Sequence, residues 1–316
     1  MLTSIPTFSD IKRSHQRISK YIYETPVMTS ANLDELAGCH LFFKCENFQK
    51  VGSFKMRGAS NKIFAYRPEE RTNGFACHSS GNHGQAVAFA AKLAETKAYV
   101  VMPKNSTKAK MDAVKDYGAE IVLCEPTENS RIKTCEKIIE DTGATLIHPF
   151  DDYSIIAGQA TAAKELIEQT EDLDAIITPV GGGGLAAGTA LISHYIDPPL
   201  EVFLGEPEEV SDTCKSLKAG KIIPNETSNT IADGLKTTIG ERNFDILKIH
   251  SDGCFTVSEK EIIAAMRLIY ERMKIVIEPS CAVPFAALLK NKKKFTGKNI
   301  GIILTGGNVD LSNLPF

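Results

Sequence analysis

The sequence lacks the features that mark membrane-spanning, secreted and nucleic-acid-binding chains. Its formal net charge is only -3 over 316 residues, so electrostatics give no reason to expect nucleic acid or an anionic membrane as a partner. No apolar run approaches the roughly 18 to 20 residues of a membrane span, and residues 1–11 lack the basic start and apolar core of a signal peptide. Charged residues make up 24% and hydrophobic residues 43%, as in ordinary soluble globular proteins.

Cysteine pairs with metal-site spacing are also missing. The eight cysteines form no CxxC motif, and several lie in apolar runs that look like strands. This pattern favours reduced, buried thiols over a disulfide framework or a zinc site. We therefore expect a cytoplasmic protein with free cysteines.

Strand-like and helix-like segments alternate along most of the chain. Strands are expected at residues 41–45, 74–78, 98–102, 120–124, 144–148, 175–180, 201–205 and 300–305. Helices are expected at residues 7–22, 59–66, 82–95, 106–117, 130–141, 155–169, 185–195, 258–273 and 282–290. The alternation predicts an α/β fold of doubly wound parallel or mixed sheets covered by helices, and the length leaves room for two domains.

Lys55 stands where an expected strand gives way to an expected helix. It lies within Gly52-Ser-Phe-Lys-Met-Arg-Gly58, between two glycines and beside an aromatic ring. The positive end of a helix dipole disfavours a cation, so a partly desolvated lysine at this place should have a lowered pKa. A neutral lysine amine condenses with an aldehyde to form a Schiff base. The alternative is a solvated lysine at a helix start.

Two glycine-rich turns offer sites for anions. Ser79-Ser-Gly-Asn-His-Gly84 follows a strand and opens a helix, where hydroxyls and N–H groups suit a substrate carboxylate. The alternative for this turn is an ordinary serine N-cap. Gly181-Gly-Gly-Gly184 also joins a strand to a helix, and its flexible backbone can direct several N–H groups at one phosphate.

A nicotinamide cofactor is an alternative ligand for the turn at residues 181–184. Gly181-x-Gly183-x-x-Ala186 fits a dinucleotide-binding pattern, and Glu206 ends the next strand near the spacing of a ribose contact. An NAD-dependent oxidoreductase of this kind would leave Lys55 and the 79–84 turn without a role.

A third turn, Thr305-Gly-Gly-Asn308, ends the last strand. A threonine hydroxyl at the carboxyl edge of a parallel sheet can hydrogen-bond a pyridine nitrogen without fixing a proton on it. The alternative is an ordinary strand-to-turn cap. Together, the lysine, the carboxylate turn, the phosphate turn and the pyridine hydroxyl describe a pyridoxal-phosphate site.

The chain resembles the fold-type II pyridoxal-phosphate enzymes, in particular the serine racemase and serine/threonine dehydratase family. Matching segments occur in order over nearly the whole chain, at residues 44–58, 79–86, 156–159, 181–184, 231–234, 278–279 and 305–310. The resemblance implies a large domain of residues 1–73 and 152–316. It also implies a small mobile domain of residues 74–151, with the active site in the cleft between the two.

The resemblance implies a role for each matching residue. Lys55 would bind the cofactor covalently and act on one face of the substrate α-carbon, and Ser80 would donate a proton at the other face. The cofactor pocket would contain Phe54, Lys55, Asn82, Gly181, Gly182, Gly183, Gly184, Leu185, Gly234, Glu278 and Thr305. The substrate carboxylate would be bound by Ser79, Ser80, Asn82, His83 and Arg131.

An acidic segment, Glu206-Pro-Glu-Glu-Val-Ser-Asp212, follows the strand at 201–205. Taken alone it is most simply a solvated loop, although oxygen ligands of this kind suit Mg²⁺ or Ca²⁺. The resemblance to serine racemases implies a structural Mg²⁺ or Ca²⁺ held by Glu206, the carbonyl of Val210 and Asp212. It further implies a homodimer, and ATP as an activator bound at the dimer interface.

The expected activity is racemisation of serine combined with β-elimination from serine and threonine. The first alternative is a dedicated dehydratase of L-serine, L-threonine or 3-hydroxyaspartate. His148-Pro-Phe-Asp-Asp152 resembles the dehydratases, whereas Arg131 and the acidic segment resemble the racemases. More remote alternatives are the NAD-dependent oxidoreductase and a binding protein that keeps the fold without the chemistry.

Overall fold

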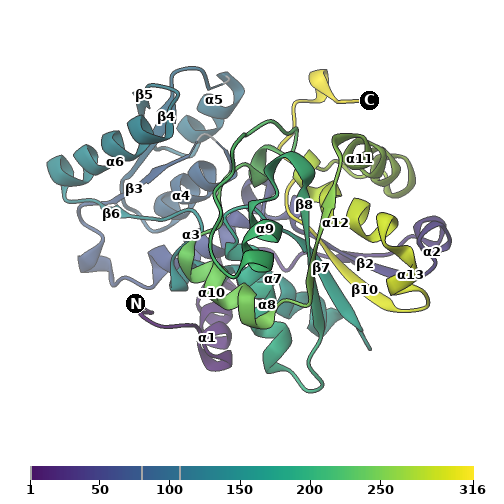
Figure 1. Ribbon diagram of the computed structural model, residues 1–316. Coiled ribbons are helices and arrows are strands. Elements are labelled where there is room, and N and C mark those ends of the chain that lie inside the picture. The colour runs from purple at the N-terminus through teal and green to yellow at the C-terminus, as the bar shows by residue number, and fades with distance from the viewer. Residues whose placement is uncertain (1, 80, 107) are drawn as a thin grey trace.

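Two sheets organise the chain, and helices cover both faces of each (Figure 1). The computed structural model describes residues 2–79, 81–106 and 108–316. The larger sheet has the strand order β1-β2-β10-β7-β8-β9, and the smaller has the order β5-β4-β3-β6. All neighbouring strands run parallel except β1, which is antiparallel to β2. The predicted fold class is confirmed.

The larger sheet is sandwiched between two layers of helices. Its strands are β1 (Val27–Met28), β2 (His40–Cys45), β7 (Ala175–Pro179), β8 (Glu201–Pro207), β9 (Gly253–Val257) and β10 (Asn299–Leu304). One layer contains α2 (Ala31–Ala37), α11 (Glu259–Met273), α12 (Pro279–Lys290) and α13 (Lys292–Phe295). The other contains α1 (Phe8–Ile18), α7 (Tyr153–Gln169), α8 (Gly184–Tyr195) and α10 (Glu241–His250).

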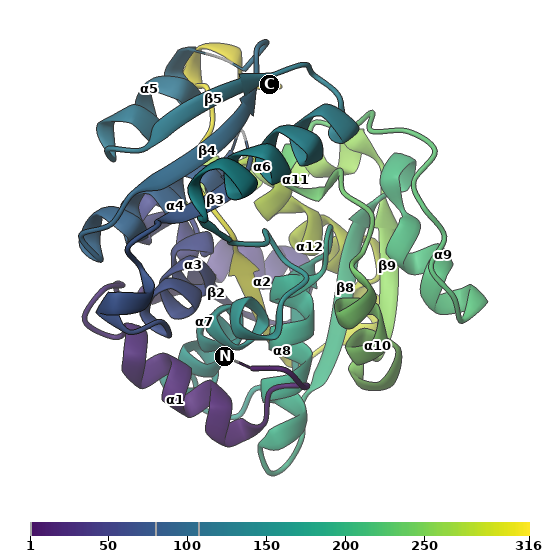
Figure 2. The ribbon, with the colours of Figure 1, turned by 90° about the vertical axis from the view of Figure 1, so that its left-hand side faces the viewer.

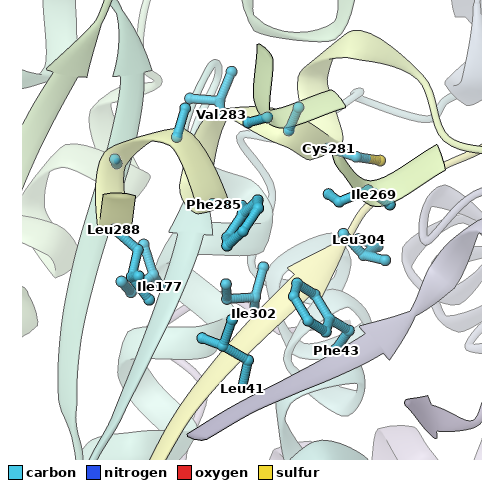
Figure 3. Close-up of a cluster of buried hydrophobic side chains, with 14 of the residues drawn as sticks. Leu41, Phe43, Ile177, Ile269, Cys281, Val283, Phe285, Leu288, Ile302 and Leu304 are labelled. Carbon is cyan, nitrogen blue, oxygen red and sulfur yellow. The ribbon is translucent and has the colours of Figure 1, made fainter. Parts of the chain in front are cut away.

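Alternating side chains of the strands fill both layers. Leu41 and Phe43 of β2 face α12, whereas Phe42 between them packs on the opposite side. Figure 3 shows Phe285 of α12 lying over Ile302 and Phe43, and the rings of Phe43 and Phe285 meet edge to face at 5.9 Å. Burying such apolar side chains is the main favourable term in the stability of the larger sheet.

The smaller sheet is built from one continuous stretch of chain. Its strands are β3 (Phe75–His78), β4 (Ala98–Pro103), β5 (Glu120–Cys124) and β6 (Thr145–Leu146), and its helices are α4 (Asn82–Leu93), α5 (Lys108–Asp116) and α6 (Glu128–Thr142). Helix α3 (Lys55–Phe64) contacts both α4 and α7, so it joins the two parts of the molecule. All four strands fall within residues 74–151, and the independent motion of that segment stays a prediction.

The sequence reading missed several short or polar elements. Strand β9 is a partly exposed edge strand, and α9 (Asp212–Ala219) is a short helix with an exposed outer side. The 3₁₀ turns are η1 (Glu46–Phe48), η2 (Lys50–Gly52), η3 (Pro68–Glu70), η4 (Glu208–Val210), η5 (Asp233–Leu235) and η6 (Leu311–Asn313). None of the helices in the described ranges combines the length and apolar character that crossing a bilayer requires.

The prediction that all cysteines are free was wrong. Cys214 of α9 and Cys254 of β9 form a disulfide, with their Cα atoms 5.3 Å apart, whereas the other six cysteines are free and buried. The two positions are 40 residues apart and carry no spacing signal. Only the packing of α9 against β9 brings the two sulfurs together.

Candidate active site

Lys55 is held between the two sheets by a turn that requires glycine. Gly52 has a φ of +68°, and a Cβ atom there would lie 2.6 Å from Oδ1 of Asn308. Ser53 forms an isolated β-bridge with Gly306, two residues beyond β10. Lys55, at the first position of α3, is thereby fixed at the carboxyl end of β10, where ligands of parallel sheets bind.

In the part of the chain that the structure describes, the Lys55 amine has a carbonyl as its hydrogen-bond partner and forms no ion pair. Its Nζ donates to the carbonyl of Pro149 at 2.8 Å and lies 5.2 Å from the centroid of the Phe54 ring. Although the side chain keeps some solvent contact, burial lowers the pKa of Lys55 to about 8, against the opposing charge of Glu278. Lys55 can therefore supply a neutral amine near neutral pH.

A chain of hydrogen bonds crosses from the smaller to the larger sheet beside Lys55. The Nδ2 group of Asn308 donates to Oδ1 of Asn82 at 2.8 Å, and Nδ2 of Asn82 donates to both carboxylate oxygens of Glu278 at 3.0 and 2.9 Å. Glu278 is 4% exposed. Burial raises the pKa of Glu278 to about 7, although the Asn82 amide opposes this shift. Glu278 can therefore change its charge near neutral pH.

The Gly181–Gly184 turn has the geometry of an anion cradle. Gly183 has a φ of +93°, and a Cβ there would lie 2.7 Å from Cβ of Asn243. The carbonyl of Gly182 is held within the protein by the N–H of Gly240 at 3.1 Å and Nδ2 of Asn243 at 2.7 Å. Within the described ranges, the N–H groups of residues 181–184 make no hydrogen bond. These donors, at the start of α8, suit a phosphate.

The start of α12 and the end of β10 form another wall of the site. Thr305 is 3% exposed, and its Oγ1 lies 3.3 Å from Sγ of Cys281. The N–H of Gly234 donates to Oγ of Ser280 at 3.1 Å. Leu185 is buried and packs in the core on the α8 side of the larger sheet. Thr305 and Gly234 therefore both contact the first turn of α12, directly after Glu278.

The predicted carboxylate-binding turn is only partly described. Ser80 lies outside the described residues. Ser79 accepts a hydrogen bond from the N–H of Gly81 at 3.2 Å, which closes the turn before α4. Nε2 of His83 lies 2.9 Å from the carbonyl of Ile147, and its buried Nδ1 finds no partner among the residues described. Burial, reinforced by the charge of Lys55, keeps the pKa of His83 well below 6.5.

Arg131 lies in α6, beside the end of β5. It occupies the first turn of α6, near enough to Cys124 at the end of β5 for its charge to act on that thiol. In the described part of the chain, no hydrogen bond or ion pair joins its side chain to Lys55 or Asn82. Arg131 is therefore not joined directly to Lys55 or Asn82 in this conformation, and its contact with the substrate carboxylate stays a prediction.

Two of the predicted cation ligands, Glu206 and Asp212, interact at the carboxyl end of β8, and Val210 lies between them in the chain. Glu206, Val210 and Asp212 are all 0% exposed. Burial raises the pKa of Glu206 to about 8, with a further contribution from the charge of Asp212, and burial also raises the pKa of Asp212 to about 6. Two adjacent buried carboxylates need a neutralising partner, so this donor set fits Mg²⁺ or Ca²⁺.

The acidic pair is linked to the glycine turn through the backbone. Oδ2 of Asp212 accepts the N–H of Ile239 at 2.8 Å. The next residue, Gly240, donates its N–H to the carbonyl of Gly182 at 3.1 Å. Asp212 is therefore connected to the Gly181–Gly184 turn through two consecutive residues.

Sequence reasoning missed several contributors to the site. Asn308 lies in the glycine-rich turn at residues 305–308 and has a polar side chain, but no role was predicted for it. The Pro149 carbonyl, Cys281 and Asn243 carried no sequence signal, because a backbone carbonyl, a buried thiol and a polar residue in a helix are common. Their roles depend on contacts between distant segments.

The donors gathered here match the chemical groups of pyridoxal phosphate. A neutral lysine amine suits its aldehyde, free N–H groups at a helix start suit its phosphate, and the Thr305 hydroxyl suits its ring nitrogen. The side-chain amide of Asn82 offers a donor to an oxygen substituent on the ring. The residues therefore fit this cofactor.

Comparison with known proteins agrees with this assignment. The family model described as "Pyridoxal-phosphate dependent enzyme" matches residues 18–306. Serine racemase of Dictyostelium discoideum is 51% identical over 312 residues, covering 98% of this chain and 96% of the relative. Its crystal structure has a TM-score of 0.92 over 96% of this chain and 99% of that one.

Two further relatives have names that correspond to the two expected reactions, dehydration and racemisation. The β-hydroxyaspartate dehydratase of Paracoccus denitrificans is 46% identical over 312 residues and covers 99% of each chain. Maize serine racemase has a TM-score of 0.96 at 41% identity, over 98% of this chain and 95% of that one. The nicotinamide alternative gains no support. The chain belongs to the family of pyridoxal-phosphate-dependent enzymes, among the serine racemases and hydroxy-amino-acid dehydratases.

Proposed function

We propose that this enzyme racemises serine and also catalyses β-elimination from serine and threonine. The observation that carries the proposal is the Lys55 amine, whose lowered pKa and carbonyl partner leave it free to act as a base. Relatives named serine racemase and β-hydroxyaspartate dehydratase support the same pair of reactions. Both reactions begin with removal of the proton on the substrate α-carbon.

Lys55 and Ser80 act on opposite faces of that carbon. When bound, pyridoxal phosphate supplies an aldehyde that captures the substrate amine and an electron sink for the charge at the α-carbon. Lys55 removes the α-proton on one face, and Ser80 returns a proton to the other face in racemisation. When the β-hydroxyl leaves before a proton returns, the products are a keto acid and ammonia.

The remaining residues hold and orient the two molecules. Gly181 to Gly184 and Leu185 would hold the phosphate with N–H groups, and Phe54 would pack beside the ring. Thr305 would donate to the ring nitrogen without a charge, and Asn82 would contact the ring oxygen. Gly234 and Glu278 line the pocket, where Glu278 fixes the Asn82 amide.

Substrate binding is coupled to closure of residues 74–151 over the larger domain, residues 1–73 and 152–316. Ser79, Ser80, Asn82 and His83 surround the substrate carboxylate at the start of α4. Arg131, at the start of α6, approaches that carboxylate on closure. Closure also excludes water from the deprotonated substrate.

A structural Mg²⁺ or Ca²⁺ binds to Glu206, the Val210 carbonyl and Asp212. The burial of both carboxylates supports this assignment. Because Asp212 is linked through Ile239 and Gly240 to Gly182, removing the cation should weaken retention of pyridoxal phosphate. Dialysis against a chelator, followed by measurement of cofactor release with and without added Ca²⁺, tests this link.

The enzyme is further proposed to be a cytoplasmic homodimer activated by ATP, with an amino-acid substrate and no nucleic-acid or membrane partner. The six free, buried thiols are compatible with a reducing compartment. Light scattering measures the oligomeric state, and an activity titration with ATP and a non-hydrolysable analogue measures activation.

A dedicated dehydratase is the second candidate. The 46% identity to β-hydroxyaspartate dehydratase over the full chain favours it, as does the segment from His148 to Asp152. Such an enzyme would use Lys55 in the same way but would not return a proton on the opposite face. Its substrates would include L-serine, L-threonine or 3-hydroxyaspartate.

Chiral product analysis separates the two candidates. The holoenzyme is incubated with L-serine and Mg²⁺, and D-serine and pyruvate are quantified together. Accumulation of D-serine that Ser80→Ala removes, while pyruvate persists, supports the racemase. Pyruvate alone indicates a dehydratase. If neither product forms, the assay is repeated with threonine and with 3-hydroxyaspartate as substrates.

A further inference from the structure

The disulfide lies directly beside the buried carboxylate of Glu206. Cys254 of β9 is paired in register with Leu204 of β8, two residues before Glu206. Its Sγ lies 4.0 Å from Oε2 of Glu206, and one ligand atom from each of Glu206, Cys214 and Cys254 lies within 4.8 Å of the others. Figure 2 shows α9 beside β9 and β8 at the edge of the larger sheet.

The carboxylate of Glu206 is held in place toward the two sulfurs. Oε2 accepts the N–H of Cys214 at 2.9 Å, and Oε1 accepts the N–H of Thr213 at 3.0 Å. Thr213 is itself 0% exposed, so solvent does not reach this side of the carboxylate. The cluster therefore has a fixed oxygen ligand.

Both cysteines are partly exposed, so a reductant can reach the bond between them. A dithiol reductant transfers two electrons and two protons to the disulfide, which becomes two thiols while the reductant becomes a disulfide. Two thiolates and a carboxylate, with a water molecule as fourth ligand, form a tetrahedral set of the kind that Zn²⁺ prefers.

We propose that reduction of Cys214 and Cys254 opens a Zn²⁺ site formed by these two thiolates and Glu206. Binding of Zn²⁺ displaces the two thiol protons, and oxidation to the disulfide removes both sulfur ligands. This site is chemically distinct from the all-oxygen Mg²⁺ or Ca²⁺ site of Glu206, Val210 and Asp212. Because both sites use Glu206, they exclude one another.

The proposal does not depend on the racemase or dehydratase activity, because metal binding is measured directly. Two preparations of the holoenzyme are compared, one oxidised and one reduced with a phosphine that is then removed. Each is titrated with Zn²⁺ against a chromophoric chelator, and with Co²⁺ as a spectroscopic probe. Tetrahedral thiolate coordination gives Co²⁺ strong visible d–d absorption, whereas six oxygen ligands give weak absorption.

The expected result is one additional tightly bound Zn²⁺ in the reduced holoenzyme, with strong Co²⁺ absorption, and neither in the oxidised one. Cys214→Ser and Cys254→Ser should each weaken Zn²⁺ binding in the reduced protein by at least the roughly 10- to 100-fold that loss of an outer-shell partner costs. Cys39→Ala, which removes a distant free thiol, should leave binding unchanged.

Competition between the two metals provides the second readout. In the reduced holoenzyme, saturating Zn²⁺ should raise the concentration of Ca²⁺ needed for half-saturation, and in the oxidised holoenzyme it should not. Two results would overturn the proposal. One is equal Zn²⁺ binding by oxidised and reduced wild type, which needs no variant to fold. The other is undiminished binding by the reduced Cys214→Ala/Cys254→Ala double variant, which would assign the ion to oxygen ligands.

Discussion

Replacing Glu278 by glutamine should shift the pH at which the apoenzyme captures pyridoxal phosphate to lower values. Capture requires the neutral amine of Lys55, and burial lowers the pKa of that amine to about 8 from an ordinary value of 10.5. The Glu278 carboxylate partly opposes the shift. Glutamine keeps the size and the hydrogen bond to Asn82 but carries no charge, so the pKa of Lys55 falls further.

The size of the effect in the wild type follows from the two pKa values. At about pH 7.5, a pKa of about 8 leaves roughly a quarter of the Lys55 amines neutral, whereas an ordinary lysine would be neutral in roughly one molecule in a thousand. The site thus raises the reactive fraction about 200-fold. The capture rate should rise with pH, reach half of its maximum near pH 8, and level off above it.

The assay mixes apoenzyme with pyridoxal phosphate at a series of pH values and follows the visible absorption band of the protein-bound cofactor. Lys55→Ala should give no such band. Glu271→Gln is the matched control, because that carboxylate is exposed on α11 and pairs with Arg267. A wild-type midpoint near 10.5, or a midpoint that Glu278→Gln moves upward, would refute the reasoning.

Three further predictions concern stability and binding. Arg57→Ala should lower the free energy of unfolding by about 3–5 kcal/mol in a urea titration, because it removes the ion-pair partner of the buried carboxylate of Glu46. Gly183→Ala should weaken cofactor affinity at a cost of about 1–3 kcal/mol, measured by equilibrium titration, because its φ of +93° is unfavourable for alanine. Lys110→Ala removes a half-exposed ion pair between Lys110 of α5 and Asp233 of η5. We expect denaturant titration to show a loss of at most about 1 kcal/mol in the free energy of unfolding, and steady-state kinetics to show a rise in KM.

The elements that the sequence predicted well are those with strong local patterns. The helix expected at 155–169 is α7 (Tyr153–Gln169), and the strand expected at 120–124 is β5 (Glu120–Cys124). Apolar periodicity and continuous apolar runs give such elements a signal that does not depend on the rest of the chain. Strand β9 lacked that signal, because its register with β8 is set by tertiary contacts.

The candidate site was predictable where one short segment contains the residues that a function needs. The glycine turn at 181–184 and the lysine of 52–58 are such segments, since each motif lies within a few consecutive residues and can be recognised without any tertiary contact. The Asn82–Asn308 hydrogen bond joins residues 226 positions apart, and the disulfide joins residues 40 apart. Contacts of this kind depend on packing, so composition and spacing could not reveal them.

Helix α3 explains how one segment supplies both a permanent charge and a neutral base. Lys55 and Arg57 are two residues apart, so they point to roughly opposite sides of the helix. Both lie at its positive end, where the dipole disfavours a cation. Arg57 is fully buried, yet its guanidinium is bound by both oxygens of Glu46 and both of Glu165 at 2.7 Å.

The pKa values of Arg57 and Lys55 shift in opposite directions because the two side chains have different hydrogen-bond partners. Burial acts to lower the pKa of Arg57, but the two carboxylates overcome it and raise that pKa above its ordinary value. Among the described residues, Lys55 donates a hydrogen bond to the Pro149 carbonyl and to no carboxylate, so burial outweighs the charge of Glu278 and lowers its pKa to about 8. The paired arginine fixes the helix to η1 and α7 through hydrogen-bonded ion pairs. The lysine on the other side is thereby held rigidly and can exchange a proton, which is the property that a base in this family needs.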